Sequence, residues 1–451
     1  MQSKEPAELL IAPRWLLPIA PVPDTFERHG VVVARGRIVG VGALEDLEAR
    51  FEPRERVSRP DHVLMPGFVN AHTRASMMLL RGLPVQGPLM RWLRETVAPA
   101  ELRWVNPDFV REGTQLAIAE MLRAGITAFG ESYLFPDEAA RAAAAARVRA
   151  VIGLPVQDAE NGADPHSVTQ LARAERLWDD YKSNPWVSLY FAPPPSYAIS
   201  DATLAHVRSV ADEIDARIAM PVHETEVEVR DTLSQHGRRP LQRLADLGLL
   251  RPGFTATHMN RLDAADLELA HQTGIAVVAC PQSDLRLGSG STPVARLQEH
   301  GVPVGLGSDS PATAGALDVL AEARLAAQLA SAREGIDERP LSAHDALHAA
   351  TLGGAVALGL SATCGSIEVG KSADLVCIDL GSLACQPVVS VADAVLFSAT
   401  RQNVSDVWVA GRAAVAQGRL LAFDEQEQRH LVQQWAARIR MTARTGVQVT
   451  S

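Results

Sequence analysis

The sequence predicts an α/β protein built on a (β/α)8 TIM barrel, with a small β domain formed by both chain ends. Residues 66–360 alternate continuous β-branched runs with capped helices, which favours a parallel sheet buried on both faces. Both ends of the chain instead show short apolar runs separated by glycine turns. A doubly wound sheet is the alternative, but no Gly-x-Gly-x-x-Gly motif follows a predicted strand.

The two chain ends show the same arrangement of strands and turns. Near the N-terminus, an apolar run at 31–34 is followed by a turn at Gly36 and a second run at 38–42. Near the C-terminus, a run at 375–378 precedes two strands that meet at Gly411. We therefore predict one β domain from residues 1–65 and 361–425, a barrel from 66–360, and a C-terminal helix or tail from 426–451.

Helix boundaries in the middle of the chain are marked by capping residues. Asn106 precedes Pro107 and Asp108, a combination typical of a helix start. Asp263 caps a second helix that ends at Gly274, and Thr292 opens a third. Each helix is followed by an apolar strand, and these predicted strands span 126–129, 275–280 and 302–306.

Composition excludes several classes of function. The 451 residues are 47% hydrophobic and carry a net charge of −10, without Lys/Arg blocks, which argues against nucleic-acid or membrane binding. No apolar run approaches the roughly 20 residues of a membrane span. Four cysteines make neither a disulfide framework nor a paired metal knuckle, so we expect a reducing, cytoplasmic location.

Titratable residues stand where predicted strands end. His72 follows the run 63–71, His223 and Glu224 follow 218–222, His258 follows 254–257, and Asp309 follows 304–308. A (β/α)8 barrel carries its chemistry at the C-terminal ends of its strands. We therefore expect these side chains to meet in one site.

The motifs around these residues resemble the amidohydrolase superfamily, in the branch of 5′-methylthioadenosine/S-adenosylhomocysteine deaminases and of triazine and guanine hydrolases. The resemblance covers nearly the whole chain. It implies a β-sandwich domain built from both chain ends beside the barrel, hydrolysis of C–N bonds in a small-molecule substrate, and a homodimer. The matching segments are Pro66–His72, Arg81–Leu83, Leu89–Leu93, His223–Thr225, Cys280–Leu287 and Gly365–Leu375.

The resemblance also implies a Zn²⁺ or Fe²⁺ ion that activates water. Its ligands would be a His-x-His pair after the first barrel strand, a histidine after the fifth and an aspartate after the eighth. His72 and Asp309 match, but Arg74 and Pro221 occupy the other two positions, and a fourth-strand substrate histidine falls on Pro194. A divalent site needs at least three protein ligands. We therefore expect a degenerate site without a metal, unless His258 or His223 is recruited as a ligand for zinc.

Arg74 is the most consequential of these replacements. Because its guanidinium is permanently cationic, we predict that it takes the place of the ion and forms a charge-assisted fork with Asp309 and Glu224. Glu224 is then either an acid/base or the salt-bridge partner of Arg74, and Asp309 is an ion-pair partner rather than a base. His258 either transfers protons or is retained by packing.

Three functions of different classes remain open. The first is a repurposed, metal-independent enzyme acting on a small polar heterocycle, with Arg74, Glu224, His258 and Asp309 in its catalytic site. Trp92 and His223 would contact the substrate, although Trp92 in the core and a structural His223 are the alternatives. The second is a non-catalytic paralogue that binds a ligand or partner. The third is a C–N hydrolase with a displaced divalent metal.

Overall fold

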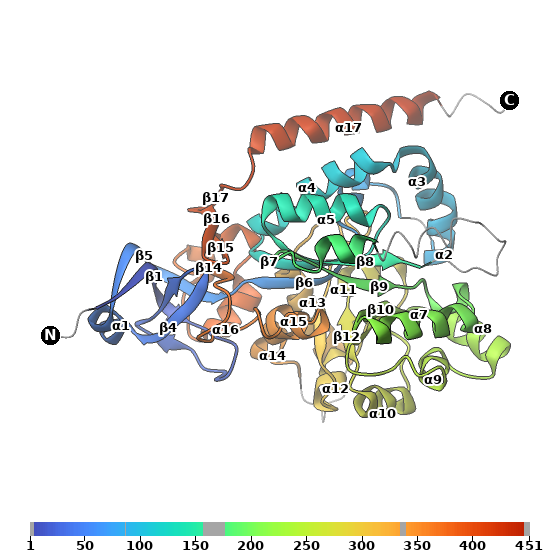
Figure 1. Cartoon of the computed structure of the whole chain (residues 1–451), viewed down its shortest axis with the longest axis horizontal. Coiled ribbons are helices and arrows are strands. Elements are labelled where there is room, and N and C mark those ends of the chain that lie inside the picture. The colour runs from blue at the N-terminus through green and yellow to red at the C-terminus, as the bar shows by residue number, and fades with distance from the viewer. Residues whose placement is uncertain (1–3, 86, 157–175, 334–339, 446–451) are drawn as a thin grey trace.

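The computed structural model describes residues 4–85, 87–156, 176–333 and 340–445, and it confirms the predicted fold class (Figure 1). Eight parallel strands with surrounding helices form the barrel, and strands from both chain ends form a separate mixed sheet. A long C-terminal helix, α17 (Glu425–Thr445), lies along one side of the barrel. Within these described ranges, no helix has both the length and the apolarity to cross a membrane.

The barrel strands follow one another in chain order around the sheet, and the first and last strands meet. Thr73 and Asp309 form a parallel bridge between them. Beside it, the Ser308 amide donates to Asn70 Oδ1 at 2.9 Å, and Asn70 Nδ2 donates to Ser308 Oγ at 2.7 Å. The strands are β6 (Phe68–Thr73), β7 (Ile126–Glu131), β8 (Arg149–Pro155), β9 (Val187–Ala192), β10 (Arg217–Val222), β11 (Phe254–His258), β12 (Ala276–Ala279) and β13 (Val304–Leu306).

Helix boundaries follow the predicted caps at Asn106 and Asp263, whereas the third predicted helix begins at Val294 after Pro293 and has no side-chain cap. Asn106 accepts a hydrogen bond from the Phe109 amide at the start of α4, and Asp263 forms a capping box with Asp266 before α10, which ends at Gly274. The longer barrel helices are α4 (Pro107–Arg123), α5 (Pro136–Ala146), α7 (Asp201–Glu213), α8 (Glu226–His236), α9 (Pro240–Asp246), α10 (Ala264–Thr273), α11 (Pro281–Leu287), α12 (Val294–Glu299), α13 (Val319–Arg333) and α14 (Ala343–His348).

Short helices extend the loops between barrel elements. After β6, the chain forms η1 (Ala75–Leu80), α2 (Leu89–Trp92), η2 (Leu93–Val97) and α3 (Ala98–Trp104) before α4. The barrel interior is filled by small apolar side chains, among them Val69, Ala128 and Val278. Arg217 lies at the N-terminal end of the barrel, where Nη2 donates to two carbonyls near α15 (Gly354–Ala357). The interior is therefore a packed core, and space for chemistry is left at the opposite end.

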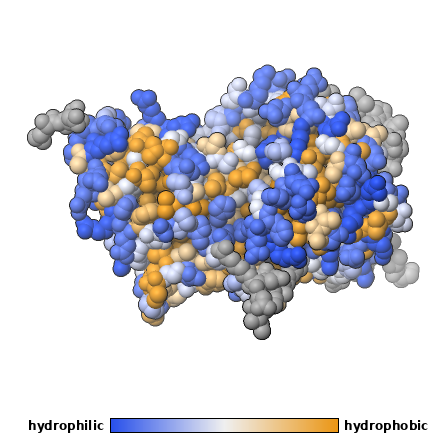
Figure 2. Space-filling model, turned by 90° about the horizontal axis from the view of Figure 1, so that it is seen from below, coloured by the Kyte–Doolittle hydropathy of each residue, from blue (hydrophilic) through white to orange (hydrophobic). Residues whose placement is uncertain are grey.

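The mixed sheet joins the two chain ends. β5 pairs with β14 antiparallel, and the Arg59 guanidinium donates to both Asp406 carboxylate oxygens at 2.6 and 2.7 Å. Seen from below, apolar residues gather at this end of the molecule (Figure 2). The strands are β1 (Glu5–Leu16), β2 (Phe26–Glu27), β3 (His29–Ala34), β4 (Arg37–Ala43), β5 (Phe51–Pro66), β14 (Leu375–Asp379), β15 (Val404–Val409), β16 (Arg412–Ala416) and β17 (Arg419–Leu420), with α1 (Leu44–Arg50) before β5.

Candidate functional site

The C-terminal ends of the barrel strands bring four predicted site residues together. His72 lies in β6, Glu224 follows β10, His258 ends β11 and Asp309 follows β13, and all four are buried. The rings of His72 and His258 meet edge to face, with centroids 5.8 Å apart. His258 and Asp309 adopt left-handed backbone conformations, with φ of 74° and 50°. Such conformations are uncommon outside glycine and persist where the surrounding structure fixes them.

Arg74 and His72 face the same oxygen of Asp309. Arg74 Nε lies 3.5 Å from Asp309 Oδ1, and His72 Nε2 lies 3.7 Å from it. Neither of the two atoms Arg74 Nε and Asp309 Oδ1 has a hydrogen-bond partner, so this contact is an ion pair and not the predicted hydrogen-bonded fork, and no ion pair joins Arg74 to Glu224 in the described ranges. Burial opposes the charge of Asp309, but Arg74, the two nearby histidines and the Ser283 hydrogen bond together outweigh burial and lower the pKa of this carboxyl. The buried His72 has its pKa lowered and is neutral.

A second cluster joins Glu224, His258 and Asp284. His258 Nδ1 and Asp284 Oδ1 are 2.8 Å apart, and both residues are buried. Burial alone would lower the pKa of His258, but the charges of Glu224 and Asp284 outweigh it and raise this pKa to about 10. Burial raises the pKa of Glu224 to about 7. The site thus contains a carboxyl that titrates near neutral pH beside a protonated imidazole, a combination suited to proton transfer.

Three supporting residues were missed by the sequence reasoning. Ser283 Oγ donates to Asp309 Oδ2 at 2.6 Å, which fixes the carboxylate that Arg74 faces. Glu131 ends β7, and its Oε2 accepts hydrogen bonds from the Ala75 amide and from Thr73 Oγ1, both at 2.7 Å. Burial raises the pKa of Glu131 to about 7. The third is Asp284, the partner of His258. Glu131 carries the same signal as the predicted residues, a polar side chain after an apolar strand, whereas Ser283 and Asp284 lie inside a helix.

The two residues that the sequence predicts to contact the substrate, His223 and Trp92, are both buried. The His223 side chain is fully buried outside the cluster, where Nε2 accepts a hydrogen bond from the Leu241 amide at 3.0 Å and Nδ1 lies 3.2 Å from the Arg261 carbonyl. This hydrogen bond ties the end of β10 to α9. Trp92 is 3% exposed and packs in the main hydrophobic core. Its indole Nε1 has no hydrogen-bond partner among the described residues.

Exposed apolar side chains surround the barrel mouth. Met90, Leu134, Tyr197 and Leu285 lie in segments that follow four different strands, and each is at least a third exposed. Tyr197 Oη reaches Met90 Sδ at 3.4 Å across two of these segments. A rim of this kind suits a flat, partly apolar ligand whose polar groups reach the buried charges below.

The residues present do not fit the ion that the family resemblance implies. Of the four ligand positions that the resemblance implies, His72 and Asp309 offer donor atoms, but Arg74 places a cation beside the same carboxylate oxygen, and Pro221 has no donor atom. A different set nevertheless meets the proximity requirement for a metal. Glu224, His258 and Asp284 offer ligand atoms that all lie within 4.8 Å of one another. This geometry does not support the expectation of a metal-free protein.

Replacing Arg74 is expected to destabilise the fold. In an Arg74→Met variant, the Asp309 carboxylate would be left buried without its cation. The loss should be about 2 kcal/mol at neutral pH, below that of a fully buried pair because the Arg74 side chain is 32% exposed. Because the folded pKa of Asp309 is lowered, this stabilisation is present at neutral pH and is lost as pH falls through that lowered value.

Urea unfolding of wild type and Arg74→Met at pH 7 and near pH 3 measures this difference. Arg440→Met, which removes an exposed arginine of α17, is the matched control. Equal stability of wild type and Arg74→Met at pH 7 would show that Asp309 does not depend on Arg74.

Comparisons with known proteins agree with the fold. The fold and the site define this chain as a (β/α)8 barrel protein with polar residues at the C-terminal ends of its strands. The chain belongs to the amidohydrolase family, whose model matches residues 63–414. It is 36% identical over 450 residues to the 5-methylthioadenosine/S-adenosylhomocysteine deaminase of Saccharophagus degradans, covering 99% of this chain and 100% of that protein. The corresponding deaminase of Teredinibacter turnerae is 36% identical over 94% of this chain and 96% of its own length.

Solved structures also match this chain along nearly its whole length. An adenosine deaminase from Xanthomonas campestris with bound zinc matches with a TM-score of 0.94 and 41% identity, covering 97% of this chain and 100% of that one. The atrazine chlorohydrolase of Arthrobacter aurescens, complexed with zinc, has a TM-score of 0.86 at 21% identity over 95% and 99% of the two chains, and shares the fold. The chain therefore has the scaffold of an amidohydrolase-superfamily deaminase or hydrolase, a family that normally binds zinc.

Proposed function

We propose that this protein is a metal-independent hydrolase that acts on a C–N bond of a small polar heterocycle. The observation that carries the proposal is the Arg74–Asp309 ion pair, which places a fixed cation beside two residual ligand positions. His258 supports it, because a protonated imidazole engaged with Asp284 is a poor metal ligand.

In this proposal the residues act on the substrate directly. Arg74 binds a carbonyl or anionic group of the ring and stabilises the negative charge that develops there. Glu224 takes a proton from the water molecule whose oxygen bonds to the ring carbon. The C–N bond then breaks, and the proton leaves with the amine, so that water and the amino-substituted ring give ammonia and the oxo ring. Protonated His258 stabilises the charged form of Glu224, which is the form that accepts the proton.

The substrate class is proposed from the relatives and from the rim. The two bacterial relatives are named for deamination of 5-methylthioadenosine and S-adenosylhomocysteine, and the X. campestris protein is an adenosine deaminase. A purine-like ring is flat and partly apolar, which suits the rim formed by Met90, Leu134 and Tyr197. We therefore propose amino-substituted purines and related heterocycles as the first substrates to test.

Metal content tests the proposal. Protein purified after growth in added zinc should contain less than about a tenth of an equivalent per chain, because three protein ligands are needed to hold the ion. Turnover of a panel of aminopurines, aminopyrimidines and aminotriazines, followed by ammonia release, should survive dialysis against a chelator. Near-stoichiometric zinc with chelator-sensitive turnover would overturn the proposal, and ligand binding without turnover would indicate a non-catalytic paralogue.

A second candidate function rests on the cluster of Glu224, His258 and Asp284. These residues could hold a displaced divalent ion, since their ligand atoms lie within 4.8 Å of one another. The protein would then be a metal-dependent aminohydrolase. Zinc bound in the wild type and lost in Asp284→Asn would favour this candidate, whereas zinc retained in that variant would place the ion elsewhere.

We also propose that the protein is a cytoplasmic homodimer. Leu383 and Val389 are each 93% exposed and lie in one segment after β14, and exposed apolar patches are typical of interfaces. The four cysteines are free and buried, in keeping with a reducing location. Sedimentation of wild type and of a Leu383→Glu, Val389→Glu variant tests the dimer, since only the variant should be monomeric.

A further inference from the structure

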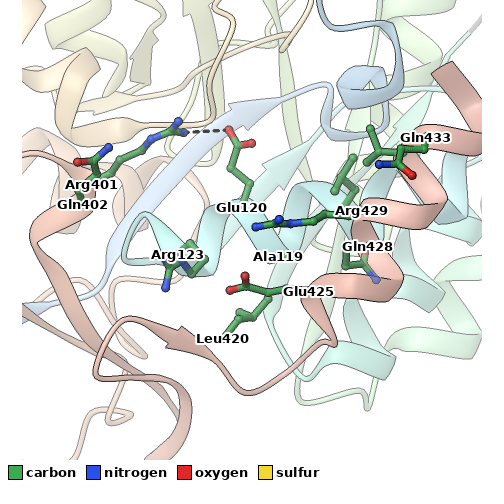
Figure 3. Close-up of a pocket in the computed structure, with 12 residues that line it drawn as sticks. Ala119, Glu120, Arg123, Arg401, Gln402, Leu420, Glu425, Gln428, Arg429 and Gln433 are labelled. Carbon is green, nitrogen blue, oxygen red and sulfur yellow. Dashed lines mark hydrogen bonds and ion pairs between the residues drawn. The ribbon is translucent and has the colours of Figure 1, made fainter.

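A cavity of about 550 Å³ lies outside the barrel, between α4, α17 and the segment η7 (Arg401–Asn403) of the mixed-sheet end (Figure 3). Its volume is within the range of small-molecule sites. None of its lining residues belongs to the site at the barrel mouth. Part of the wall is apolar, since Leu116 from α4 and Val432 from α17 are among the lining residues.

Positive charge is in excess in this cavity. Three arginines and two glutamates line it, and one of the glutamates, Glu120, is already neutralised. Its carboxylate accepts hydrogen bonds from Arg81 at 2.7 and 2.8 Å and from Arg401 at 3.3 Å. The guanidinium groups of Arg123 and Arg429 have no hydrogen bond or ion pair within the part of the chain that the structure describes. Figure 3 shows Arg429 extending from α17 across the cavity toward α4.

We propose that this cavity binds a small organic anion, with its phosphate or carboxylate held between Arg123 and Arg429. Guanidinium groups match the oxygens of both anions and form short, charge-assisted hydrogen bonds with them. The apolar part of the anion rests against Leu116 and Val432. The carboxylate of Glu425 faces the same space and competes with the anion for the arginines.

Isothermal titration of the full chain with phenyl phosphate tests the proposal. Phenyl phosphate should bind more tightly than inorganic phosphate, because only the former has an apolar part, and benzoate distinguishes a carboxylate site from a phosphate site. The Arg123→Gln, Arg429→Gln double variant should weaken binding at least tenfold, about 1.4 kcal/mol. Glu425→Gln should tighten binding, because it removes the competing charge.

Arg440→Gln is the matched control, since it removes an exposed arginine of the same helix and should leave the affinity unchanged. Unchanged affinity in the double variant would overturn the proposal. So would affinity that is lost in Arg74→Met, because the anion would then bind at the barrel mouth. Binding of phenyl phosphate weaker than about 1 mM to the wild type would also overturn it. These outcomes do not depend on whether the protein is a hydrolase.

Discussion

An Arg74→His, Pro221→His double variant is expected to bind close to one equivalent of zinc per chain, against less than about a tenth for the wild type. The two substitutions add imidazoles at the two positions where the family resemblance places missing ligands. His72 Nε2 and Asp309 Oδ1 already lie 3.7 Å apart, a separation that one ion can bridge at ordinary ligand distances. Removing the Arg74 guanidinium also removes the charge that opposes a dication at this carboxylate.

Elemental analysis after growth in added zinc measures this change. Arg440→His, on the exposed side of α17, is the control for adventitious binding to an added imidazole. Zinc should also raise the melting temperature of the double variant, because an ion that binds only the folded chain stabilises it. If the double variant stays free of zinc while remaining folded, the two replaced positions do not decide whether this site binds an ion.

Glu224→Gln is expected to lower turnover by about 10²–10⁴-fold on any substrate that the panel identifies. The amide cannot take the proton from water, whereas its shape matches the carboxyl. Because the pKa of Glu224 is raised to about 7, the wild-type rate should fall as pH decreases below this value and level off above it. The residual rate of the variant should lack this dependence. Glu226→Gln, an exposed neighbour at the start of α8, is the control.

The same variant gives a result that needs no substrate. A carboxyl whose folded pKa lies above its ordinary value of 4.5 contributes stability below that value and loses it as pH rises through about 7. Glu224→Gln should therefore gain stability relative to wild type between pH 5 and 8, by up to about 3 kcal/mol. A constant difference across this range would show that Glu224 is ionised throughout, and the proposed base would then have an ordinary pKa.

Much of this fold could be predicted because local signals and tertiary structure agree. Asn106 and Asp263 cap helices as their neighbours indicate, and the apolar runs between helices become buried parallel strands. The placement of His72, His258 and Asp309 follows from the barrel itself, since residues at the C-terminal strand ends must converge. Because both faces of these parallel strands are buried, polar side chains that follow them gather at the C-terminal end of the barrel.

The sequence did not predict the directions of side chains at points where the chain leaves a strand. His223 directly follows β10 but has a φ of 55°, which turns its side chain toward α9, while the next residue, Glu224, faces the site. Sequence spacing alone cannot reveal a local reversal of this kind. Asp284 was missed because it lies in α11, and only the tertiary contact with His258 distinguishes it from an ordinary acid in a first helical turn.

Closure of the barrel has a consequence for how the protein acquires activity. Asn70 and Ser308, which hydrogen-bond across the closing seam, are 238 residues apart in the sequence. Arg74 and Asp309 lie beside them, so their ion pair forms only after the last barrel strand has docked against the first. Contacts of such long range form late, because the loop that they close is long. During synthesis, nearly the whole barrel must leave the ribosome before this charge pair can exist. Recovery of function on refolding should therefore report the final closing step, after most helices and strands have already formed.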